Sequence, residues 1–126
     1  MDITLLDHLV LTVADVNVTC AFYNEVLGMH IQQFGDDRKA LKFGHQKINL
    51  HQKGTEFEPK AHLPTPGSAD LCFITTTPLN IVIRELQDKN IPIPEGPVER
   101  TGAEGKILSV YFRDPDDNLI EVSNYL

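Results

Sequence analysis

The order of the predicted elements repeats along the chain, and this repeat constrains the fold more than any other feature. From about residue 4 to 52 the sequence predicts a strand, a helix and three strands, and from about 69 to 126 the same order returns. Residues 53–68, with three prolines and two glycines, are typical of a linker. Because neither half can cover both faces of its own sheet, we expect one α+β domain. In it, two βαβββ modules form a curved mixed sheet with the helices outside and a concave cavity inside.

The first half begins with the strand Leu5–Val13, in which alternation places His8 on the face opposite to Leu9. An imidazole is unusual on a strand that otherwise looks half-buried. The helix that follows has Asn17 as its expected N-cap and Gly28 as its stop. Three more strands are predicted at Met29–Phe34, Arg38–Phe43 and Lys47–Gln52.

The second half repeats this order, beginning with the strand Asp70–Thr76. Thr77 is the expected N-cap of the next helix, Pro78 its first residue, and the helix is expected to end near Asn90. The last strands are predicted at Val98–Arg100, Ile107–Arg113 and Leu119–Ser123, with an Asp-rich turn before the final one.

Superposing the two halves pairs polar residues. His8 then matches Asp70, since both lie early in a first strand, and Asn49 matches Glu121, since both lie in a fourth strand. His51 lies two residues after Asn49 and therefore on the same strand face. We expect these groups to converge in the cavity.

The composition excludes several kinds of partner. The net charge is −7 and the 11 Lys and Arg are dispersed, so neither nucleic acid nor an anionic membrane is an expected partner. No apolar run reaches the roughly 18 residues of a membrane span, and no basic leader precedes the first strand, so we expect a cytoplasmic protein. Cys20 and Cys72 have apolar neighbours and are expected to be reduced, packed thiols.

Three segments resemble the vicinal oxygen chelate superfamily, which includes glyoxalase I, methylmalonyl-CoA epimerase, fosfomycin-resistance proteins, extradiol dioxygenases and bleomycin-resistance proteins. They are D-H-L-V-L-T-V at residues 7–13, A-F-Y-N-E-V-L-G-M at 21–29, and V-Y-F-R-D-P-D-D-N-L-I-E-V at 110–122. The chain is most similar to small glyoxalase-domain-containing, virulence-associated proteins. These segments are specific for the superfamily but not for one reaction.

By position, the resemblance implies metal ligands at His8, Asp70 and Glu121. Asp70 stands where the family usually has histidine, and Asn49 where it usually has Glu or Gln. His51 is our fourth ligand because imidazole binds a divalent ion better than a neutral amide; a proton shuttle or a cavity wall are its other possible roles. This mixed nitrogen and oxygen set suits Zn, Ni, Mn, Fe or Co.

The resemblance implies a metalloenzyme of lactoylglutathione lyase or epimerase type that binds a small oxygen-chelating substrate and abstracts a proton. The base would be one of the carboxylates, Glu121 or Asp70, or else His51. One alternative is an extradiol dioxygenase, and another is a metal-free small-molecule binding protein of the bleomycin-resistance kind. We also expect a homodimer, because each half leaves a sheet edge and a sheet face to be covered. The linker allows the halves to close within one chain or to be exchanged between two chains.

Overall fold

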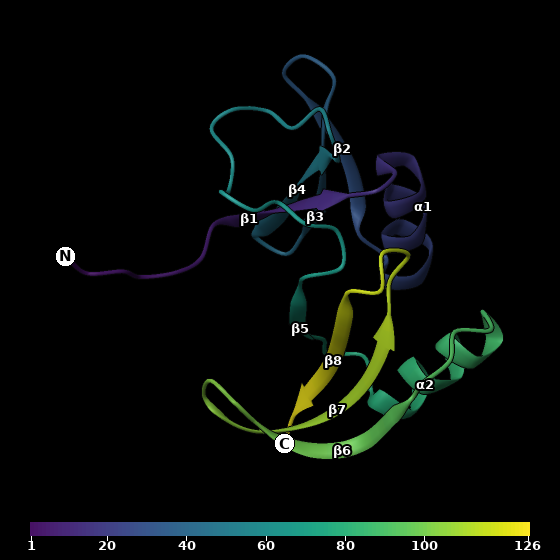
Figure 1. Ribbon diagram of the computed structural model, residues 1–126. Helices are drawn as coiled ribbons and strands as arrows, with labels where there is room; N and C mark the ends of the chain where they lie inside the picture. Colours follow the sequence, from purple (N-terminus) through teal and green to yellow (C-terminus); the bar gives the residue numbers. More distant parts are fainter. The chain divides into compact units, whose positions relative to one another are not determined.

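The computed structural model describes all 126 residues, which form two compact units, Met1–Gly67 and Ser68–Leu126 (Figure 1). Each unit contains one strand, one helix and three further strands in that order, and each has an open four-stranded mixed sheet. The predicted α+β class and the two βαβββ modules are therefore confirmed.

The first unit has strand order β1-β4-β3-β2, with β1 parallel to β4 and the other pairs antiparallel. Its elements are β1 His8–Val13, α1 Val16–Leu27, β2 His30–Phe34, β3 Arg38–Phe43 and β4 Gln46–Gln52. Strand β1 is shorter than predicted, because residues 5–7 form no strand pairing and Leu5 and Leu6 are exposed.

The second unit repeats this topology with strand order β5-β8-β7-β6, again with its first strand parallel to its last. Its elements are β5 Asp70–Ile74, α2 Leu79–Asp88, β6 Glu95–Gly102, β7 Gly105–Arg113 and β8 Leu119–Tyr125. The last three strands are longer than predicted. Strand β6 is the clearest case, because pairing with β7 extends it across the sequence G-P-V-E-R-T-G, which has little strand propensity of its own.

The strand register shows how the two units correspond. In the first unit Val10 lies opposite Asn49, and in the second Cys72 lies opposite Glu121. His8 precedes Val10 by two residues, and Asp70 precedes Cys72 by two. The strand register therefore places His8 and Asp70 at equivalent positions of the two units, and likewise Asn49 and Glu121, as predicted. By the same register, His51 corresponds to Ser123, because these residues lie opposite Thr12 and Ile74.

Each helix covers one face of the sheet in its own unit. In the first unit the core contains Tyr23 and Cys20 of α1 together with Leu11, Val13, Leu41, Ile48 and Leu50 of the sheet. In the second it contains Leu79, Val82 and Leu86 of α2 together with Val110, Phe112, Ile120 and Val122. Burying each of the larger side chains contributes roughly 1.5–3 kcal/mol. The other face of each sheet carries the polar residues singled out by the sequence.

The helix starts differ from the predicted caps. Asp15, not Asn17, caps α1, because its Oδ1 accepts hydrogen bonds from the backbone N–H groups of Asn17 and Val18 at 2.9 and 3.2 Å. At the other end, Gly28 has φ 69° and ends the helix as predicted.

At α2 the N-cap is Pro78, which offers no side-chain acceptor, so Thr77 is not the cap. Asn124 of β8 supplies the missing acceptor, since its Oδ1 receives the N–H of Leu79 at 2.9 Å. Its amide nitrogen donates to the carbonyl oxygens of Thr75 and Thr77, each at 2.9 Å. The side chain of a distant residue therefore closes this helix end.

The Asp-rich segment before β8 is a turn, as predicted. Asp114 Oδ1 accepts the N–H groups of Asp116 and Asn118 at 2.9 and 3.0 Å, and Asp117 has φ 63°. The Asp114 carboxylate is thus used within the turn.

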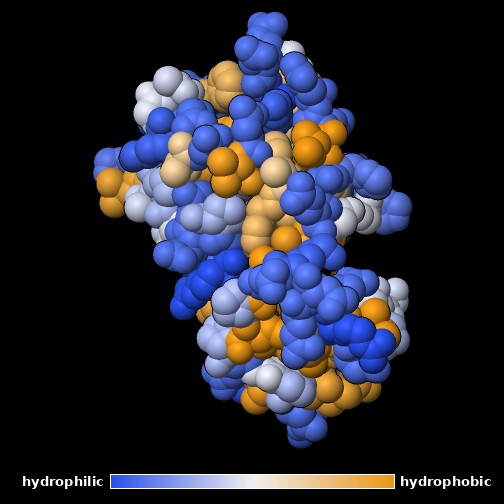
Figure 2. Space-filling model, turned by 90° about the vertical axis from the view of Figure 1, so that its right-hand side faces the viewer, coloured by the Kyte–Doolittle hydropathy of each residue, from blue (hydrophilic) through white to orange (hydrophobic).

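The surface in the view of Figure 2 has hydrophobic side chains in separate patches among hydrophilic ones. Neither helix has the length and apolar character needed to cross a bilayer.

Candidate functional site

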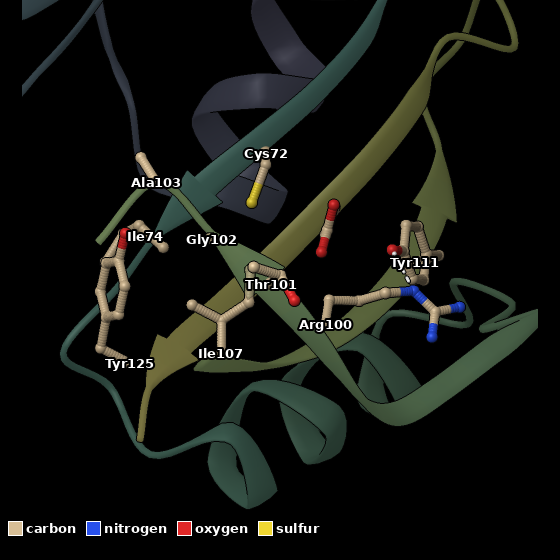
Figure 3. A pocket seen from close by; sticks show the side chains of 10 residues that line it. Cys72, Ile74, Arg100, Thr101, Gly102, Ala103, Ile107, Tyr111 and Tyr125 are labelled. Atoms are coloured by element: carbon tan, nitrogen blue, oxygen red, sulfur yellow. Dashed lines mark hydrogen bonds between the residues drawn. The ribbon is translucent and has the colours of Figure 1, made fainter. Parts of the chain in front are cut away.

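A pocket of about 410 Å³ opens on the face of the second sheet that α2 does not cover (Figure 3). This volume suits a small molecule. Strands β5, β7 and β8 supply its floor, while β6 and the turn after it supply a wall. The lining residues are Cys72, Ile74, Arg100, Thr101, Gly102, Ala103, Ile107, Tyr111, Glu121 and Tyr125.

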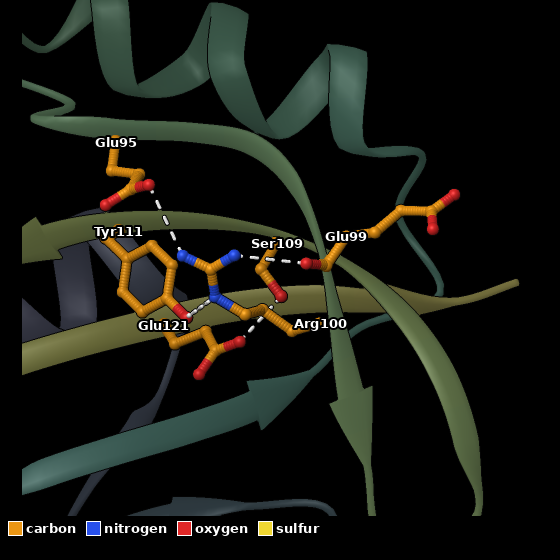
Figure 4. Close-up of polar contacts among 6 residues, drawn as sticks. All are labelled: Glu95, Glu99, Arg100, Ser109, Tyr111 and Glu121. Carbon is orange, nitrogen blue, oxygen red and sulfur yellow. Dashed lines mark hydrogen bonds and ion pairs between the residues drawn. The ribbon is translucent and has the colours of Figure 1, made fainter.

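Glu121 is held in this pocket by a buried pair of serines, of which Figure 4 shows Ser109. The Ser109 hydroxyl donates to Glu121 Oε1 at 2.6 Å, because an ionised carboxylate can only accept. The Ser109 oxygen lies 2.7 Å from Ser123 Oγ, and both serines are fully buried. Since Ser109 directs its hydrogen to Glu121, Ser123 is the donor between the two serines. The carboxylate orientation is therefore fixed from inside the sheet.

A second polar group, Arg100, lies beside Glu121 in Figure 4. Its Nε–H donates to the Tyr111 hydroxyl at 3.1 Å, and its Nη2 pairs with Glu95 at 3.3 Å. Desolvation raises the pKa of Tyr111, and the nearby Glu121 carboxylate adds to the rise, whereas the Arg100 hydrogen bond opposes it. Tyr111 thus stays a neutral phenol that links the guanidinium to the carboxylate site.

Cys72 lies opposite Glu121 in the register, on the pocket face. Its thiol is free and exposed, so the prediction that it is packed is wrong, whereas Cys20 is buried as expected. Alternation explains the difference, because Cys72 shares its face with Asp70 and not with the half-buried Leu71 and Phe73. Desolvation, together with the neighbouring carboxylates, raises the pKa of the Cys72 thiol, while its contact with Ser123 opposes this.

In the first unit, His8 lies at the exposed start of β1. Its Nδ1 is 2.7 Å from Asp7 Oδ1. A hydrogen on Nδ1 satisfies this contact and leaves the lone pair on Nε2. A carboxylate that orients a histidine in this way is typical of metal-binding imidazoles.

Asn49 and His51 lie next to each other on the same face of β4 and are buried, with 7% and 3% of their surface exposed. Asn49 Oδ1 and His51 Nε2 have no hydrogen-bond partner. The His51 ring lies edge-on to Phe57, with centroids 5.4 Å apart. Burial lowers the pKa of His51, and the nearby Arg38 lowers it further, so the ring is neutral at pH 7.

The predicted ligands are divided between the two units. His8 and His51 belong to the first, and Asp70 and Glu121 belong to the second. The structure contains no group of three or more His, Cys, Asp or Glu side chains placed to hold an ion. His51 lies opposite Thr12, four positions along β1 from His8, which is about 13 Å along the strand.

The available donors nevertheless fit a divalent cation in kind. They are the second imidazole nitrogen of His8, Nε2, an amide oxygen of Asn49 without a partner, and the carboxylates of Asp70 and Glu121. Such a mixed set suits first-row transition metals. Ser109 and Tyr111 were not singled out from the sequence. Alternation along Ile107–Arg113 places Ser109 and Tyr111 on one face, and that signal was available.

Comparisons with known proteins agree with this architecture. The family described as the Glyoxalase/Bleomycin resistance protein/Dioxygenase superfamily matches residues 5–122. Virulence protein STM3117 of Salmonella typhimurium is 63% identical over 126 residues, which are 100% of this chain and 88% of that protein. Its crystal structure superposes with a TM-score of 0.99, with 100% of both chains covered. Glyoxalase domain-containing protein RDO1 of Mycosarcoma maydis is 59% identical over 95% of this chain and 68% of its own length.

Two more distant structures share the fold. Lactoylglutathione lyase from Agrobacterium tumefaciens is 20% identical, with a TM-score of 0.75 over 98% of this chain and 96% of its own. A mutant of the fosfomycin resistance protein FosX from Listeria monocytogenes, complexed with Mn(II) and 1S,2S-dihydroxypropylphosphonic acid, is 20% identical. Its TM-score is 0.67 over 99% of this chain and 93% of its own. From its matched family and its relatives, the chain belongs to the Glyoxalase/Bleomycin resistance protein/Dioxygenase superfamily, and so to the vicinal oxygen chelate proteins.

Proposed function

We propose that this chain is a glyoxalase-like metalloenzyme of the vicinal oxygen chelate type that abstracts a proton from a small oxygen-chelating substrate. The observation that carries the proposal is the register, in which His8 corresponds to Asp70 and Asn49 to Glu121. Four donor groups therefore stand at equivalent places on the helix-free faces of two sheets. The proposal requires such faces of a first and a second unit to meet, within one chain or between two.

In this proposal His8, Asp70 and Glu121 hold one divalent cation. For the fourth position the register supports Asn49, which is the counterpart of Glu121 and has an unpartnered oxygen. His51 has the better donor atom, but the register separates it from His8. A bound cation would polarise a substrate carbonyl and stabilise negative charge that develops beside it. The FosX complex with Mn(II) is a case of metal binding on this fold.

The chain's own residues supply the proton transfer. Glu121 is the proposed base, because Ser109 fixes Oε1 and so sets the direction in which the carboxylate can take a proton. His51 is the second candidate, because its ring is buried and neutral and therefore has a free lone pair. The closed walls of a buried site would exclude water and strengthen these interactions.

Two other functions compete with this proposal. An extradiol dioxygenase needs two histidines and one carboxylate around iron, and Asp70 occupies the position at which a second histidine would serve. A metal-free binding protein is favoured by the apolar part of the pocket, which Ile74, Ile107 and Tyr125 line.

Metal content distinguishes these functions. Protein purified without tag or chelator is analysed for Mn, Fe, Co, Ni and Zn, and the same ions are titrated into metal-free protein by calorimetry. We expect the parent to bind about one ion per chain. Tight binding should be lost in His8→Ala and in Glu121→Gln, and the affinity should be lower in Asp70→Ala than in the parent. His45→Ala, an exposed turn histidine, is the matched control and should bind as the parent does.

The loaded protein is then assayed for two reactions. Isomerisation of the hemithioacetal formed from methylglyoxal and a thiol would support the proposal, and oxygen uptake with catechols would support the dioxygenase. A parent protein that binds no ion after reconstitution would instead be a small-molecule binding protein.

A further inference from the structure

A row of basic side chains crosses the whole sheet of the first unit. Strand pairing places Lys47 opposite His8 on one side and opposite Lys42 on the other, and Lys42 opposite His30. Residues that lie opposite each other project from the same face. The row His8, Lys47, Lys42, His30 therefore contains one basic residue from each of the four strands.

Two lysines directly opposite each other repel and destabilise the sheet. Neither Lys42 nor Lys47 forms an ion pair. In the second unit the corresponding positions of β8 and β7 hold Leu119 and Arg113, so the topology itself does not require this arrangement. A pair of like charges that is locally unfavourable and that no ion pair relieves is typical of a functional site.

A second cationic group lies further along the same face. Arg38 comes directly before Lys39, which is opposite Leu50, and in this antiparallel pair Arg38 therefore lies next to His51. The Arg38 guanidinium lies over the Phe34 ring at 5.2 Å and over the Phe57 ring at 4.6 Å. Both contacts are of the cation–π type, and the guanidinium forms no ion pair, so its N–H groups are available to a ligand.

The aromatic contacts also hold the lysine row in place. Lys47 Nζ lies 4.2 Å from the centroid of Phe34, the ring that also contacts Arg38. Phe34 therefore joins the two cations into one cluster on the face opposite to α1. The buried Nε2 of His51 has no partner at this place.

Carboxylates close to this face are already occupied. Asp7 contacts His8 Nδ1, Glu56 accepts the N–H of Gly54, and Glu58 pairs with Lys60. Three cations, Arg38, Lys42 and Lys47, thus face two carboxylates without a lysine partner, Asp7 and Glu56, which leaves a small local excess of positive charge on a chain whose net charge is −7. Such an excess concentrates anions at the site.

We infer that the helix-free face of the first unit binds the oxyanion group of a small molecule, with Arg38 and Lys47 as its principal contacts. The ligand class is a carboxylate, phosphate or phosphonate of metabolite size. Arg38 offers a planar pair of donors that fits two oxygens, and Lys47 adds a point charge. That this group belongs to the substrate rests on the function proposed above, whereas the anion site itself needs no metal.

The test is a titration of metal-free protein with inorganic phosphate and, separately, with malonate, followed by amide NMR. We expect shifts in residues 34–51 and none in α2. The affinity should fall about tenfold in Arg38→Gln and in Lys47→Gln, because each loses a charge-assisted contact. Arg84→Gln and Lys89→Gln, at exposed positions in or next to α2, are the matched controls and should leave the affinity unchanged. Lys42→Gln, also exposed, gives a third variant if one of the others fails to fold.

The stronger of the two anions identifies the ligand class. Equal affinities in the parent, Arg38→Gln and Lys47→Gln would overturn the inference, as would shifts confined to the second unit. Because the titration contains no metal, binding of phosphate or malonate supports this site even if the metal titrations contradict the proposed enzyme.

Discussion

Ser109 donates a 2.6 Å hydrogen bond to Glu121 from the neighbouring strand, and its own oxygen lies 2.7 Å from Ser123. The two strands that carry these residues are directly paired, with Tyr111 opposite Glu121 and Ser109 opposite Ser123. The carboxylate proposed as ligand and base is thus oriented by a hydroxyl that belongs to the rigid interior of the sheet.

Replacing Ser109 with alanine should weaken metal binding without removing it. The carboxylate would lose its fixed orientation, and changes of this kind cost about 10–100-fold in affinity. Calorimetric titration of the metal-free variant measures the effect. Ser123→Ala should have the smaller effect, because Ser123 lies 3.5 Å from Glu121 Oε1. Parent affinity in Ser109→Ala would show that Glu121 needs no orienting partner.

Asn49→Ala should reduce metal affinity more than His51→Ala does. From the sequence alone the imidazole of His51 was the preferred ligand. In the strand register, however, Asn49 is the residue that corresponds to Glu121. The same calorimetric titration, applied to both variants, ranks the two residues. A larger loss of metal affinity in His51→Ala would show that His51, and not Asn49, is the fourth ligand.

The stability of the protein should fall between pH 8 and pH 5.5 in a manner that depends on His51. Burial lowers the pKa of His51 below its ordinary value of 6.5. As the pH falls through that value, the unfolded chain takes up the proton first, so the free energy of unfolding decreases. Urea unfolding at several pH values measures this slope. It should be shallower in His51→Gln and unchanged in the control His45→Gln.

Cys72 should react slowly with iodoacetamide although it is exposed. Desolvation raises its pKa, and the Glu121 and Asp70 carboxylates raise it further, so little thiolate is present at pH 8. The alkylation rate, followed by mass spectrometry, should rise in Asp70→Asn. Cys20 is buried and should react only after unfolding. A rate for Cys72 equal to that of an unhindered thiol would contradict the electrostatic account.

We predict a homodimer in solution. Each sheet has unpaired edge strands, β1 and β2 in one unit and β5 and β6 in the other. Val10 and Ile74, on the helix-free faces, are 46% and 50% exposed. Sedimentation measures the oligomeric state, and a monomer at micromolar concentration would oppose the prediction.

Refolding His8→Ala and Glu121→Gln chains together then tests whether the two units are exchanged between chains. Only a dimer with exchanged units can restore one intact metal site in the mixture.

Much of the fold follows from local sequence patterns. Alternating apolar residues and glycine stops gave the order of elements in both halves, and that order predicted the matching of His8 with Asp70. The features that were missed depend on distant residues. Asn124 closes the start of α2 from 45 positions away, and pairing with β7 extends β6 beyond the predicted Val98–Arg100.

In the candidate site, too, some residues were predictable from local sequence and others depend on contacts between distant residues. Residue types and spacing pointed to Glu121 and Asn49, whereas the Ser109 contact and the cluster of Arg38 with Phe34 and Phe57 depend on strand register and on the path of residues 53–67. The register also decides that Lys42 and Lys47 lie opposite each other. No local pattern in the sequence contains that information.

The Asn124 contact has a consequence for the order in which the chain matures on the ribosome. Strand β8 lies between β5 and β7, and Asn124 near its end closes α2, so the second unit lacks both its inner strand and a helix cap until residue 124 has emerged. The first unit has all its strands by Gln52. During synthesis the unit that carries Arg38 and Lys47 can therefore fold first, while the unit that carries Glu121 is still incomplete.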